Sequence, residues 1–295
     1  MSKISANKGG SATGQRVDKK QTNTLENITF AFVDVETTGL SPEYGDRVCE
    51  VAVLKVKNNC QIDLFHTLVN CERKISPGAF AVNGITQNML KGKPKFSEIA
   101  PQILRLLNGC VVVCHNAVFD MSFLAAELER CSLSFPNYTV VDTLMLSRRC
   151  FKFFSNALQN VAMCLNIEVQ EEHRALSDVL TTWKVFQRFV ENFSWRGIST
   201  VEQLISLQSE PTRRRWNKDY ALPPQLEEAV KNKKTLRLKY VSREGKTTER
   251  TIEPLEITRY SDYFYLVGYC RLRNAERMFR LDRVIELNPV EQTGK

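Results

Sequence analysis

The sequence predicts a layered α/β domain followed by a small, mostly β domain. Three strand-like stretches open the chain after residue 27, and helices that alternate with short strands follow them up to Phe193. A run of strands followed by alternating helices and strands is typical of an α/β layered fold. From Thr235 onward the pattern is almost entirely strand-like, and prolines with clustered charge between residues 210 and 224 separate the two parts.

The first domain is expected to begin with an antiparallel meander. Ile28–Val35, Val48–Val56 and Asp63–Val69 are rich in apolar and β-branched residues, which favour strands. Ser97–Leu107 carries isoleucine and leucine at the spacing of one helical face, so we expect a helix there. Two short strands and three helices complete the predicted domain: strands Val111–Cys114 and Thr139–Val141, helices Phe119–Arg130, Asn156–Leu165 and Ala175–Phe193.

The second domain is predicted from alternating apolar and basic residues. Leu236, Leu238 and Tyr240 alternate with Arg and Lys, the pattern of a strand with one buried face, and Tyr263–Tyr269 and Arg277–Leu281 are further strands. The expected segments are a disordered tail over residues 1–27, the first domain over 28–193, a linker with a short helix over 194–230 and the β domain over 231–292.

Charge is unevenly spread along the chain. The formal net charge is +8, and the segments 1–27, 28–193 and 194–295 carry +3, −1 and +6. A neutral, acid-bearing middle followed by a basic last third suits a polyanionic partner such as nucleic acid. A solvated lysine-rich face explains the same charge equally well.

Composition excludes several classes of protein. No apolar stretch is long enough to span a bilayer, and the polar N-terminal segment lacks the apolar core of a secretory signal, so no membrane partner is expected. The nine cysteines never occur as Cys-x-x-Cys, which favours reduced thiols in a cytoplasmic protein. Cys110, Cys114 and His115 lack the second ligand pair that a structural zinc site usually needs.

Acidic residues stand at the ends of predicted elements. Asp34 and Glu36 are two positions apart at the end of a buried strand, so they point the same way. Two carboxylates on one face suit a hard divalent cation. Two acidic residues with no further evidence, however, more often mark the polar end of a strand. Asp120 stands at the start of a helix, and Asp178 near the start of the last helix of the domain, five residues after His173.

Three motifs that contain these residues resemble a known family. Asp-Val-Glu-Thr-Thr-Gly-Leu (34–40), His-Asn-Ala-Val-Phe-Asp (115–120) and His-Arg-Ala-Leu-Ser-Asp (173–178) are similar to the exonuclease motifs of the DEDDh family, which includes the proofreading epsilon subunit of DNA polymerase III, oligoribonuclease and RNase T. The resemblance covers residues 28–193 and implies a ribonuclease H-like exonuclease fold. Asn83 stands where many relatives have histidine, and we expect little consequence.

The resemblance implies a site and a reaction. Asp34, Glu36, Asp120 and Asp178 would hold two Mg²⁺ or Mn²⁺ ions, which clamp an in-line displacement at phosphorus. His173 would be the general base that deprotonates the attacking water, since its pKa lies near neutrality. The expected products are nucleoside 5′-monophosphates released from a 3′ end.

The resemblance also implies substrate contacts. Thr37, Thr38 and Leu40 would meet the terminal nucleotide, with Leu40 as an apolar wedge against the base. His115, Asn116 and Phe119 would shape the neighbouring wall, although core packing explains Phe119 better. Asp142 and His66 are expected to have structural roles.

The basic C-terminal segment resembles the WYL domain, a small β-barrel of bacterial transcription regulators. The similarity spans Leu236–Pro289, where the name-giving Trp-Tyr-Leu reads Phe264-Tyr265-Leu266. In that family the domain is thought to sense a ligand, often a nucleic acid or nucleotide. Guanidinium groups and aromatic faces suit phosphates and bases, and a solvated basic face is the alternative. The candidate ligand-binding residues are Tyr240, Tyr265, Arg271, Arg273, Arg280 and Arg283.

The favoured function is a two-metal-dependent 3′–5′ exonuclease acting on single-stranded nucleic acid with a free 3′ end, with DNA favoured over RNA. The C-terminal domain is expected to bind or sense nucleic acid. Two alternatives remain: a non-catalytic nucleic-acid-binding regulator and a polymerase-associated proofreading subunit. Retention of all five motif residues argues against the first, because binding alone does not require them.

Overall fold

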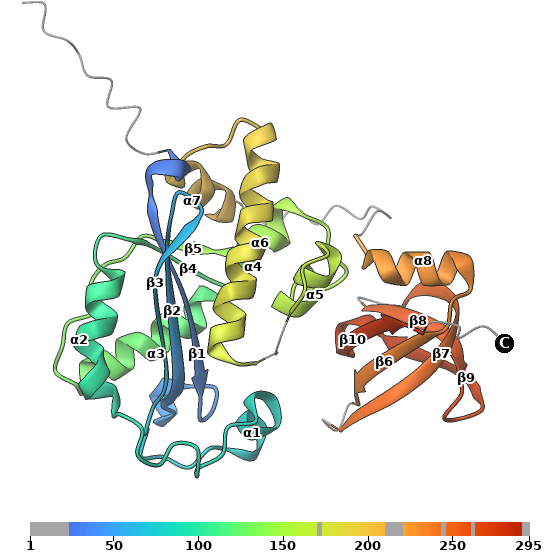
Figure 1. Ribbon diagram of the computed structural model, residues 1–295, viewed down its shortest axis with the longest axis horizontal. Helices are drawn as coiled ribbons and strands as arrows, with labels where there is room; N and C mark the ends of the chain where they lie inside the picture. The colour runs from blue at the N-terminus through green and yellow to red at the C-terminus, as the bar shows by residue number, and fades with distance from the viewer. Residues whose placement is uncertain (1–23, 170–172, 210–220, 243–245, 261–262, 291–295) are drawn as a thin grey trace, which may run out of the picture.

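A five-stranded mixed sheet forms the framework of the first domain (Figure 1). The computed structural model describes residues 24–169, 173–209, 221–242, 246–260 and 263–290. The strands lie in the order β3-β2-β1-β4-β5; β1, β2 and β3 pair antiparallel, whereas β4 runs parallel to β1 and β5. The strands are β1 (Thr29–Thr37), β2 (Val48–Lys57), β3 (Cys60–Leu68), β4 (Val111–Cys114) and β5 (Val140–Asp142). The predicted antiparallel meander is therefore confirmed.

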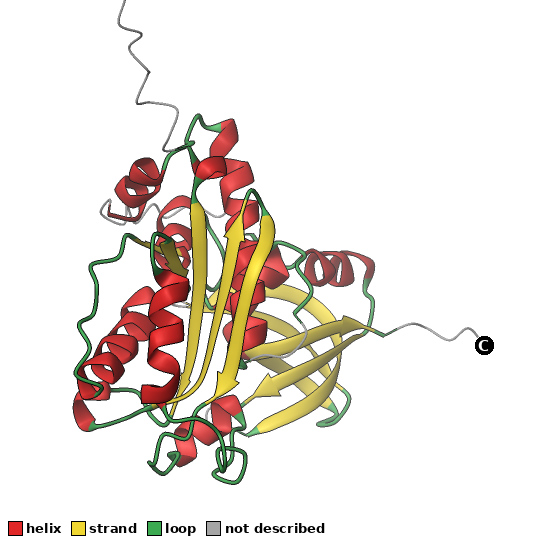
Figure 2. Cartoon of the chain, turned by 60° about the vertical axis from the view of Figure 1, so that its left-hand side comes forward, coloured by secondary structure: helices red, strands yellow, loops and turns green. Residues whose placement is uncertain are grey.

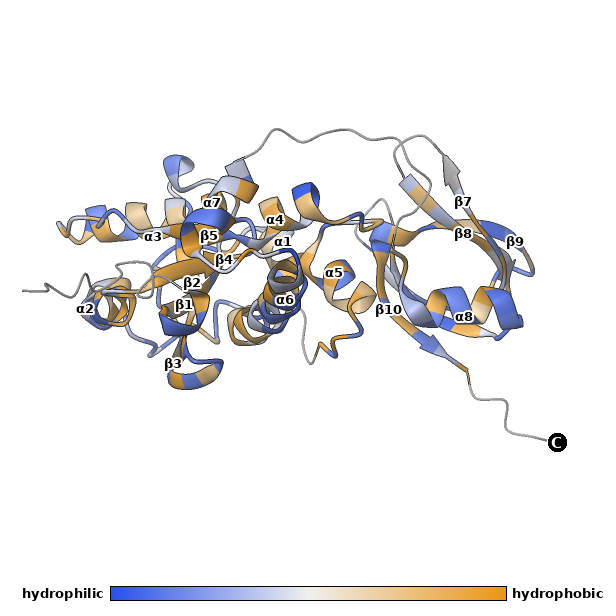
Figure 3. Cartoon of the chain, turned by 90° about the horizontal axis from the view of Figure 1, so that it is seen from above, coloured by the Kyte–Doolittle hydropathy of each residue, from blue (hydrophilic) through white to orange (hydrophobic). Residues whose placement is uncertain are grey.

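Helices cover both faces of this sheet (Figure 2). Because side chains alternate along β1, Phe30 and Phe32 pack in one core with α6, whereas Ala31, Val33 and Val35 pack in another with α2 and α3. Figure 3 shows hydrophobic residues concentrated on the central strands. The helices are α1 (Pro77–Asn83), α2 (Phe96–Leu107), α3 (Ala117–Arg130), α4 (Thr143–Cys150), α5 (Leu158–Cys164), α6 (Ala175–Trp195) and α7 (Val201–Ser209), with the short 3₁₀ turns Leu25–Asn27 and Pro42–Tyr44.

Helix α4 was not predicted, and its start has a clear local cause. Asp142 ends β5, and its Oδ1 atom accepts hydrogen bonds from the main-chain N–H groups of Leu144 (2.8 Å) and Met145 (3.3 Å). A carboxylate that satisfies the free donors at a helix start is an N-cap. The chain can therefore turn from strand to helix without an intervening loop.

Helix α7, expected within the linker, packs on the first domain. Val201 and Leu204 are buried in the same core as α6. At the open edge of β5, the Gln208 side chain accepts from the main-chain N–H of Asp142 (2.9 Å) and donates to the carbonyl of Val140 (2.9 Å). Leu25, from the last part of the expected tail, is also buried there. We propose that the first domain spans residues 24–209.

The second sheet is antiparallel, with the order β10-β6-β7-β8-β9. A closed barrel was expected, and this part of the prediction is wrong, because β9 and β10 do not pair within the described residues and the sheet is open. Helix α8 covers the inner face with Leu226 and Ala229, so the apolar interior is shielded without closure. The elements are α8 (Pro224–Asn232), β6 (Leu236–Val241), β7 (Thr247–Tyr260), β8 (Tyr263–Cys270), β9 (Ala275–Arg280), the 3₁₀ turn Leu281–Arg283 and β10 (Val284–Pro289).

The two domains touch beside helix α5. Ala221 forms a parallel bridge with Phe153, and its N–H donates to the carbonyl of Lys152 (2.7 Å). Phe154 packs against the core of the second domain. Among the described residues, no helix has the length and apolar character needed to cross a membrane.

Candidate metal centre and active site

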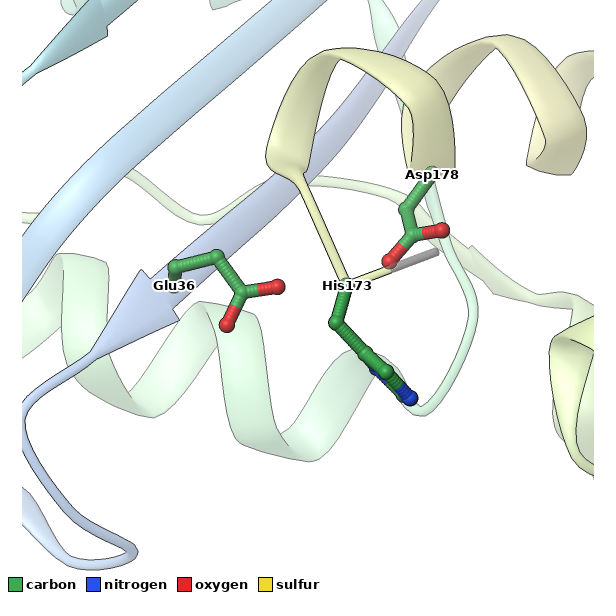
Figure 4. A group of neighbouring side chains, drawn as sticks. All are labelled: Glu36, His173 and Asp178. Atoms are coloured by element: carbon green, nitrogen blue, oxygen red, sulfur yellow. The ribbon is translucent and has the colours of Figure 1, made fainter. Parts of the chain in front are cut away.

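Four carboxylates and a histidine meet where β1 ends. Asp34 and Glu36 project from β1, Asp120 comes from the first turn of α3, and Asp178 from the first turn of α6. His173 lies two positions before the first residue of α6. Figure 4 shows Glu36, His173 and Asp178 as neighbours from β1, the segment before α6 and α6, and their potential ligand atoms lie within 4.8 Å of each other. The structure thus brings together all five residues of the three motifs.

Asp120 is tied to the main chain between the two β1 carboxylates. Its Oδ1 atom accepts a hydrogen bond from the N–H of Val35 (3.0 Å), and its side chain is buried. Since Asp34 and Glu36 flank Val35, this one contact holds carboxylates from β1 and α3 at a common point. Alternation along the strand places Asp34 and Glu36 on the same face.

Burial and mutual repulsion raise the pKa values of these acids. Burial is the larger cause for each carboxyl, and neighbouring carboxylates add to it. The pKa of Glu36 is raised to about 8 and that of Asp178 to about 7, and those of Asp34 and Asp120 lie well above their ordinary values. Such a cluster is stabilised by protons or by cations.

Asp178 shows that a cation fits this cluster. Its Oδ1 atom is buried and has no hydrogen-bond partner among the described residues. Burying a carboxylate oxygen without a partner is energetically costly. Oxygen atoms of this kind are the ligands that hard divalent cations prefer. The four carboxylates therefore form a suitable donor set for divalent metal.

His173 adopts a backbone conformation that is rare for a residue with a side chain. Its φ is 55°, in the left-handed region, and its N–H donates to the carboxylate of Asp178. Burial lowers the pKa of the imidazole, so the ring is neutral at neutral pH and can accept a proton.

The loop after β1 is tightly folded and presents one exposed leucine. Thr38 Oγ1 accepts from the N–H of Arg47 (3.0 Å), and Asp46 Oδ2 accepts from the N–H of Ser41 (3.2 Å). A side chain at Gly39 would collide with the Asp46 carboxylate, since its Cβ would lie 2.2 Å from Oδ2. Leu40 is 87% exposed, as a wedge against a base would need to be. Thr37 and Thr38, by contrast, are buried.

His115 and Asn116 are held by local contacts. His115 Nδ1 bonds with the Thr143 hydroxyl (2.9 Å) and Nε2 with the Asn156 carbonyl (2.9 Å), and burial lowers the pKa of the ring to about 4. The N–H of Asn116 donates to Asp142 (3.1 Å). These contacts shape the wall beside Asp120, and the local structural role expected for Asp142 is confirmed.

Phe119 packs against Phe123, with the two rings tilted and their centroids 4.9 Å apart, and joins the core beneath α3. The exposed apolar residue of the same motif is its neighbour Val118, whose side chain is 79% exposed. Core packing therefore accounts for the aromatic ring, and only the edge of this motif reaches the surface.

Two groups beside the site were not among the residues expected to form it, although Asn83 was noted as a departure from the family pattern. Asn83 is buried, donates to the carbonyl of Thr37 (3.3 Å), and lowers the pKa of Glu36 through a hydrogen bond. Glu50 is fully buried on β2 and pairs with Arg174, the residue after His173. The available signal for Glu50 was one acid within an otherwise apolar strand.

The C-terminal candidates do not form one cluster. Tyr265 and Arg280 are directly opposite each other on β8 and β9. Arg280 also forms a two-point ion pair with Asp282 and stacks on the Tyr263 ring at 3.4 Å. Tyr240 instead packs edge-on against the core residue Phe279, at 5.4 Å.

Three of the candidate arginines lie apart from the pair formed by Tyr265 and Arg280. Arg271 pairs with Glu253 (2.9 Å), Arg273 lies in the turn before β9, and Arg283 ends the turn before β10.

The central strand of a mixed sheet ends in clustered carboxylates, and a neutral histidine lies beside them. This arrangement fits the class of metal-dependent enzymes that cleave phosphodiester bonds. The exonuclease family (RNase_T) matches residues 31–186, so the chain belongs to this family, and its exonuclease domain is of the DEDDh type. The WYL domain matches residues 222–289. Both resemblances predicted from the sequence are confirmed, and the exonuclease fold implies divalent metal ions.

Known proteins of this family share the exonuclease domain. The chain is 34% identical over 186 residues to the DNA polymerase III PolC-type of Thermotoga petrophila, covering 63% of this chain and 14% of that protein. It is 34% identical over 208 residues to the 3′-5′ exonuclease DinG of Staphylococcus epidermidis, covering 70% of this chain and 22% of that one. The chain thus spans a small part of the length of these relatives.

A solved structure confirms the fold. E. coli Exonuclease I in complex with a dT13 oligonucleotide superposes with a TM-score of 0.50 and 19% identity, covering 82% of this chain and 55% of that one. At this identity the likeness shows the fold alone, and it confirms the predicted ribonuclease H-like exonuclease fold.

Proposed function

We propose that this chain is a two-metal-dependent 3′–5′ exonuclease that releases nucleoside 5′-monophosphates from single-stranded nucleic acid. The observation that carries the proposal is the convergence of Asp34, Glu36, Asp120 and Asp178 beside His173, with one Asp178 oxygen buried and unpaired. The 3′–5′ direction is supported by the similarity to the exonuclease DinG.

The four carboxylates would hold two Mg²⁺ or Mn²⁺ ions. Bound divalent ions polarise a phosphoryl oxygen and lower the pKa of coordinated water. The raised pKa values of Glu36 and Asp178 support this assignment, because a cation replaces the protons that the cluster otherwise retains near neutral pH.

The protein's own groups supply proton transfer and positioning. His173, neutral because burial lowers its pKa, would accept the proton of the attacking water. Leu40, exposed on a braced loop, would pack against the terminal base, and the main chain of Thr37 and Thr38 would border the nucleotide. His115 and Asn116 would shape the neighbouring wall, and Phe119 would support it from the core.

DNA is the favoured substrate, because a relative that matches 63% of this chain is a DNA polymerase. The C-terminal domain is proposed to bind or sense nucleic acid, and the pairing of Tyr265 with Arg280 and the +6 charge of residues 194–295 support this. A cytoplasmic location is supported by nine free cysteines.

A direct assay tests the function. Purified full-length protein with Mn²⁺ or Mg²⁺ is given single-stranded DNA, single-stranded RNA and duplex DNA, each with a free or a blocked 3′ end. We expect mononucleotide release from free 3′ ends, fastest on single-stranded DNA, and none from Asp34→Ala protein that still folds and binds DNA. Absence of mononucleotide from every substrate would refute the proposal and favour a non-catalytic regulator.

A proofreading subunit of a polymerase is the second candidate, since the PolC-type relative is a polymerase. This candidate predicts that the chain co-purifies with a polymerase and removes mismatched 3′ ends faster than matched ones. Equal rates on both ends, without a co-purifying polymerase, would set it aside.

A further inference from the structure

Glu50 is a buried carboxylate whose two oxygens are both occupied by protein donors. Oε1 bonds to Arg174 Nη2 (2.8 Å) and His66 Nε2 (2.7 Å), and Oε2 accepts from Arg174 Nε (3.1 Å) and the N–H of Ala175 (3.2 Å). The Glu50 side chain is 0% exposed. With two-point pairing and two further donors, this acid is saturated and does not resemble the metal-binding acids beside it.

These contacts join β2 to the beginning of α6. Arg174 is the residue before the helix, and Ala175 carries one of the N–H groups that have no partner within a helix. In the strand register, Glu50 stands directly opposite Glu36. The contact therefore sets how far the start of α6, which carries Asp178, lies from the end of β1, which carries Glu36.

The same contacts restrain His173. This residue lies between residues 170–172, which are outside the described ranges, and the anchored Arg174. Its left-handed φ of 55° is unfavourable for a residue with a side chain, and such a conformation persists only where neighbouring contacts impose it. The Glu50–Arg174 pair on one side and the Asp178 carboxylate on the other supply those contacts.

Stability alone is a weak reason for this arrangement. Removing two charges from water is costly, and well-packed apolar residues often stabilise a core equally well. What an apolar pair cannot supply is the fork geometry that defines the direction of the Arg174 side chain and main chain.

We propose that Glu50 and Arg174 are positioning residues that hold His173 and Asp178 in register with Glu36. The proposal rests on the exonuclease function proposed above and extends it to two residues outside the four carboxylates and His173. His66 supports the same carboxylate from β3.

The test is a double-mutant cycle in the full-length protein. Glu50→Gln keeps the shape of the side chain and removes the charge that Arg174 needs. We expect kcat to fall about 10- to 100-fold with KM nearly unchanged, as misplacement of a catalytic group by about 1 Å does. The part of this loss that acts through His173 disappears when His173 is absent, whereas the part that acts through Asp178 remains. Glu50→Gln should therefore lower the activity of His173→Ala protein by a clearly smaller factor than it lowers that of the wild type.

Arg174 supplies a second set of variants should Glu50→Gln fold poorly. Arg174→Lys keeps the charge but not the fork, so we expect a kcat between those of wild type and Arg174→Ala, each at unchanged KM. If the activity of the double mutants falls below detection, the positioning role is tested by the Arg174 single variants, in which kcat should fall and KM should stay unchanged.

Glu127 offers a matched control. It is also fully buried and pairs at two points with an arginine, Arg47, whose neighbouring N–H at Val48 donates to it as well. This pair braces the loop that presents Leu40 and not the start of α6. Glu127→Gln should therefore raise KM. Its fold-loss of activity and that of His173→Ala should multiply in the double mutant, because the two residues act independently.

The outcomes separate the two proposals. Wild type that releases no mononucleotide overturns both. If the wild type is active, two results would overturn the positioning role alone. One is a Glu50→Gln variant that retains full kcat. The other is a loss of activity from Glu50→Gln that multiplies with the loss from His173→Ala, as the loss from Glu127→Gln does. A raised KM at unchanged kcat in the Arg174 variants overturns it as well.

Discussion

Asp178 combines its proposed catalytic task with a cost to folding. Its carboxylate lies among other acids, one of its oxygens has no hydrogen-bond partner in the described part of the chain, and its pKa is raised to about 7. At the scale of the single residue, this carboxylate therefore lowers the stability of the metal-free fold and leaves an oxygen atom available to a cation.

Asp178→Asn should separate these two effects. Removing the charge relieves repulsion, so the Tm of metal-free protein should rise at pH 8, by about 2–4 °C for each kcal/mol gained. Activity should fall at least about 100-fold, since metal ions contribute several kcal/mol to the transition state. Thermal unfolding with chelator and a mononucleotide-release assay measure the two; a lower Tm with retained activity would contradict the assignment.

The same raised pKa values predict how metal-free stability depends on pH. A carboxyl whose pKa rises on folding holds its proton more tightly when folded, so stability falls as pH climbs from the ordinary pKa to the raised one. Glu36 rises from 4.5 to about 8 and Asp178 from 3.8 to about 7. The metal-free chain should lose stability between about pH 4 and 8.

Added metal ion provides the comparison. Millimolar Mn²⁺ should restore the Tm at pH 8, because it neutralises the ionised cluster, and should have little effect at pH 5. Thermal unfolding curves at several pH values, with chelator or Mn²⁺, measure both trends. A metal-free Tm that increases from pH 5 to pH 8 would show that other groups dominate.

At the scale of elements, α7 closes the first domain. Leu204 is fully buried against the α6 side of the sheet, and Gln208 satisfies main-chain groups at the free edge of β5. An exposed sheet edge invites unwanted pairing, and a covering helix is one way that proteins prevent it.

Leu204→Ala should destabilise the first domain by about 2–5 kcal/mol, the usual cost of a large-to-small change in a core. Ser206→Ala, on the exposed side of the same helix, is the matched control and should change stability by less than about 0.5 kcal/mol. Denaturant unfolding measures both. Equal, small effects would mean that α7 belongs to the linker.

At the scale of the whole molecule, a basic domain is joined to a nearly neutral catalytic one. Residues 210–295, which contain the linker and the second domain, carry +6 (19 basic and 13 acidic residues), whereas residues 28–193 carry −1. Ala221 and Phe154 place the second domain beside the segment that follows α4.

Full-length protein should therefore bind long single strands with a stronger salt dependence than a chain that ends at Ser209. Each phosphate neutralised on a single strand contributes about −0.7 to the slope of log K against log salt concentration. Fluorescence titrations of a labelled oligonucleotide with Ca²⁺, between low and moderate salt, measure the difference. Identical slopes would indicate that the second domain does not contact the strand.

Much of the site could be predicted from local signals. Alternation within β1 places Asp34 and Glu36 on one face, and helix starts carry Asp120 and Asp178, but these patterns alone also fit polar strand and helix ends. The resemblance of the three short motifs to the DEDDh family is what implied the site. The open second sheet could not be predicted, because whether β9 meets β10 depends on how α8 fills the interior. Glu50 was missed since nothing nearby in sequence reveals its partner, which stands 124 positions further on.

The sequence by itself determined the meander, the principal helices, the two-domain order and the identity of the four acids and His173, because period and motif are properties of neighbouring residues. Only the tertiary structure decided that Asp178 keeps an unpaired oxygen and that α7 joins the first core. The structure also decided that Glu50 grips the start of α6. These three features depend on contacts between segments far apart in the chain. Burial strengthens polar contacts and makes unpaired polar atoms costly, because the protein interior has a low dielectric constant.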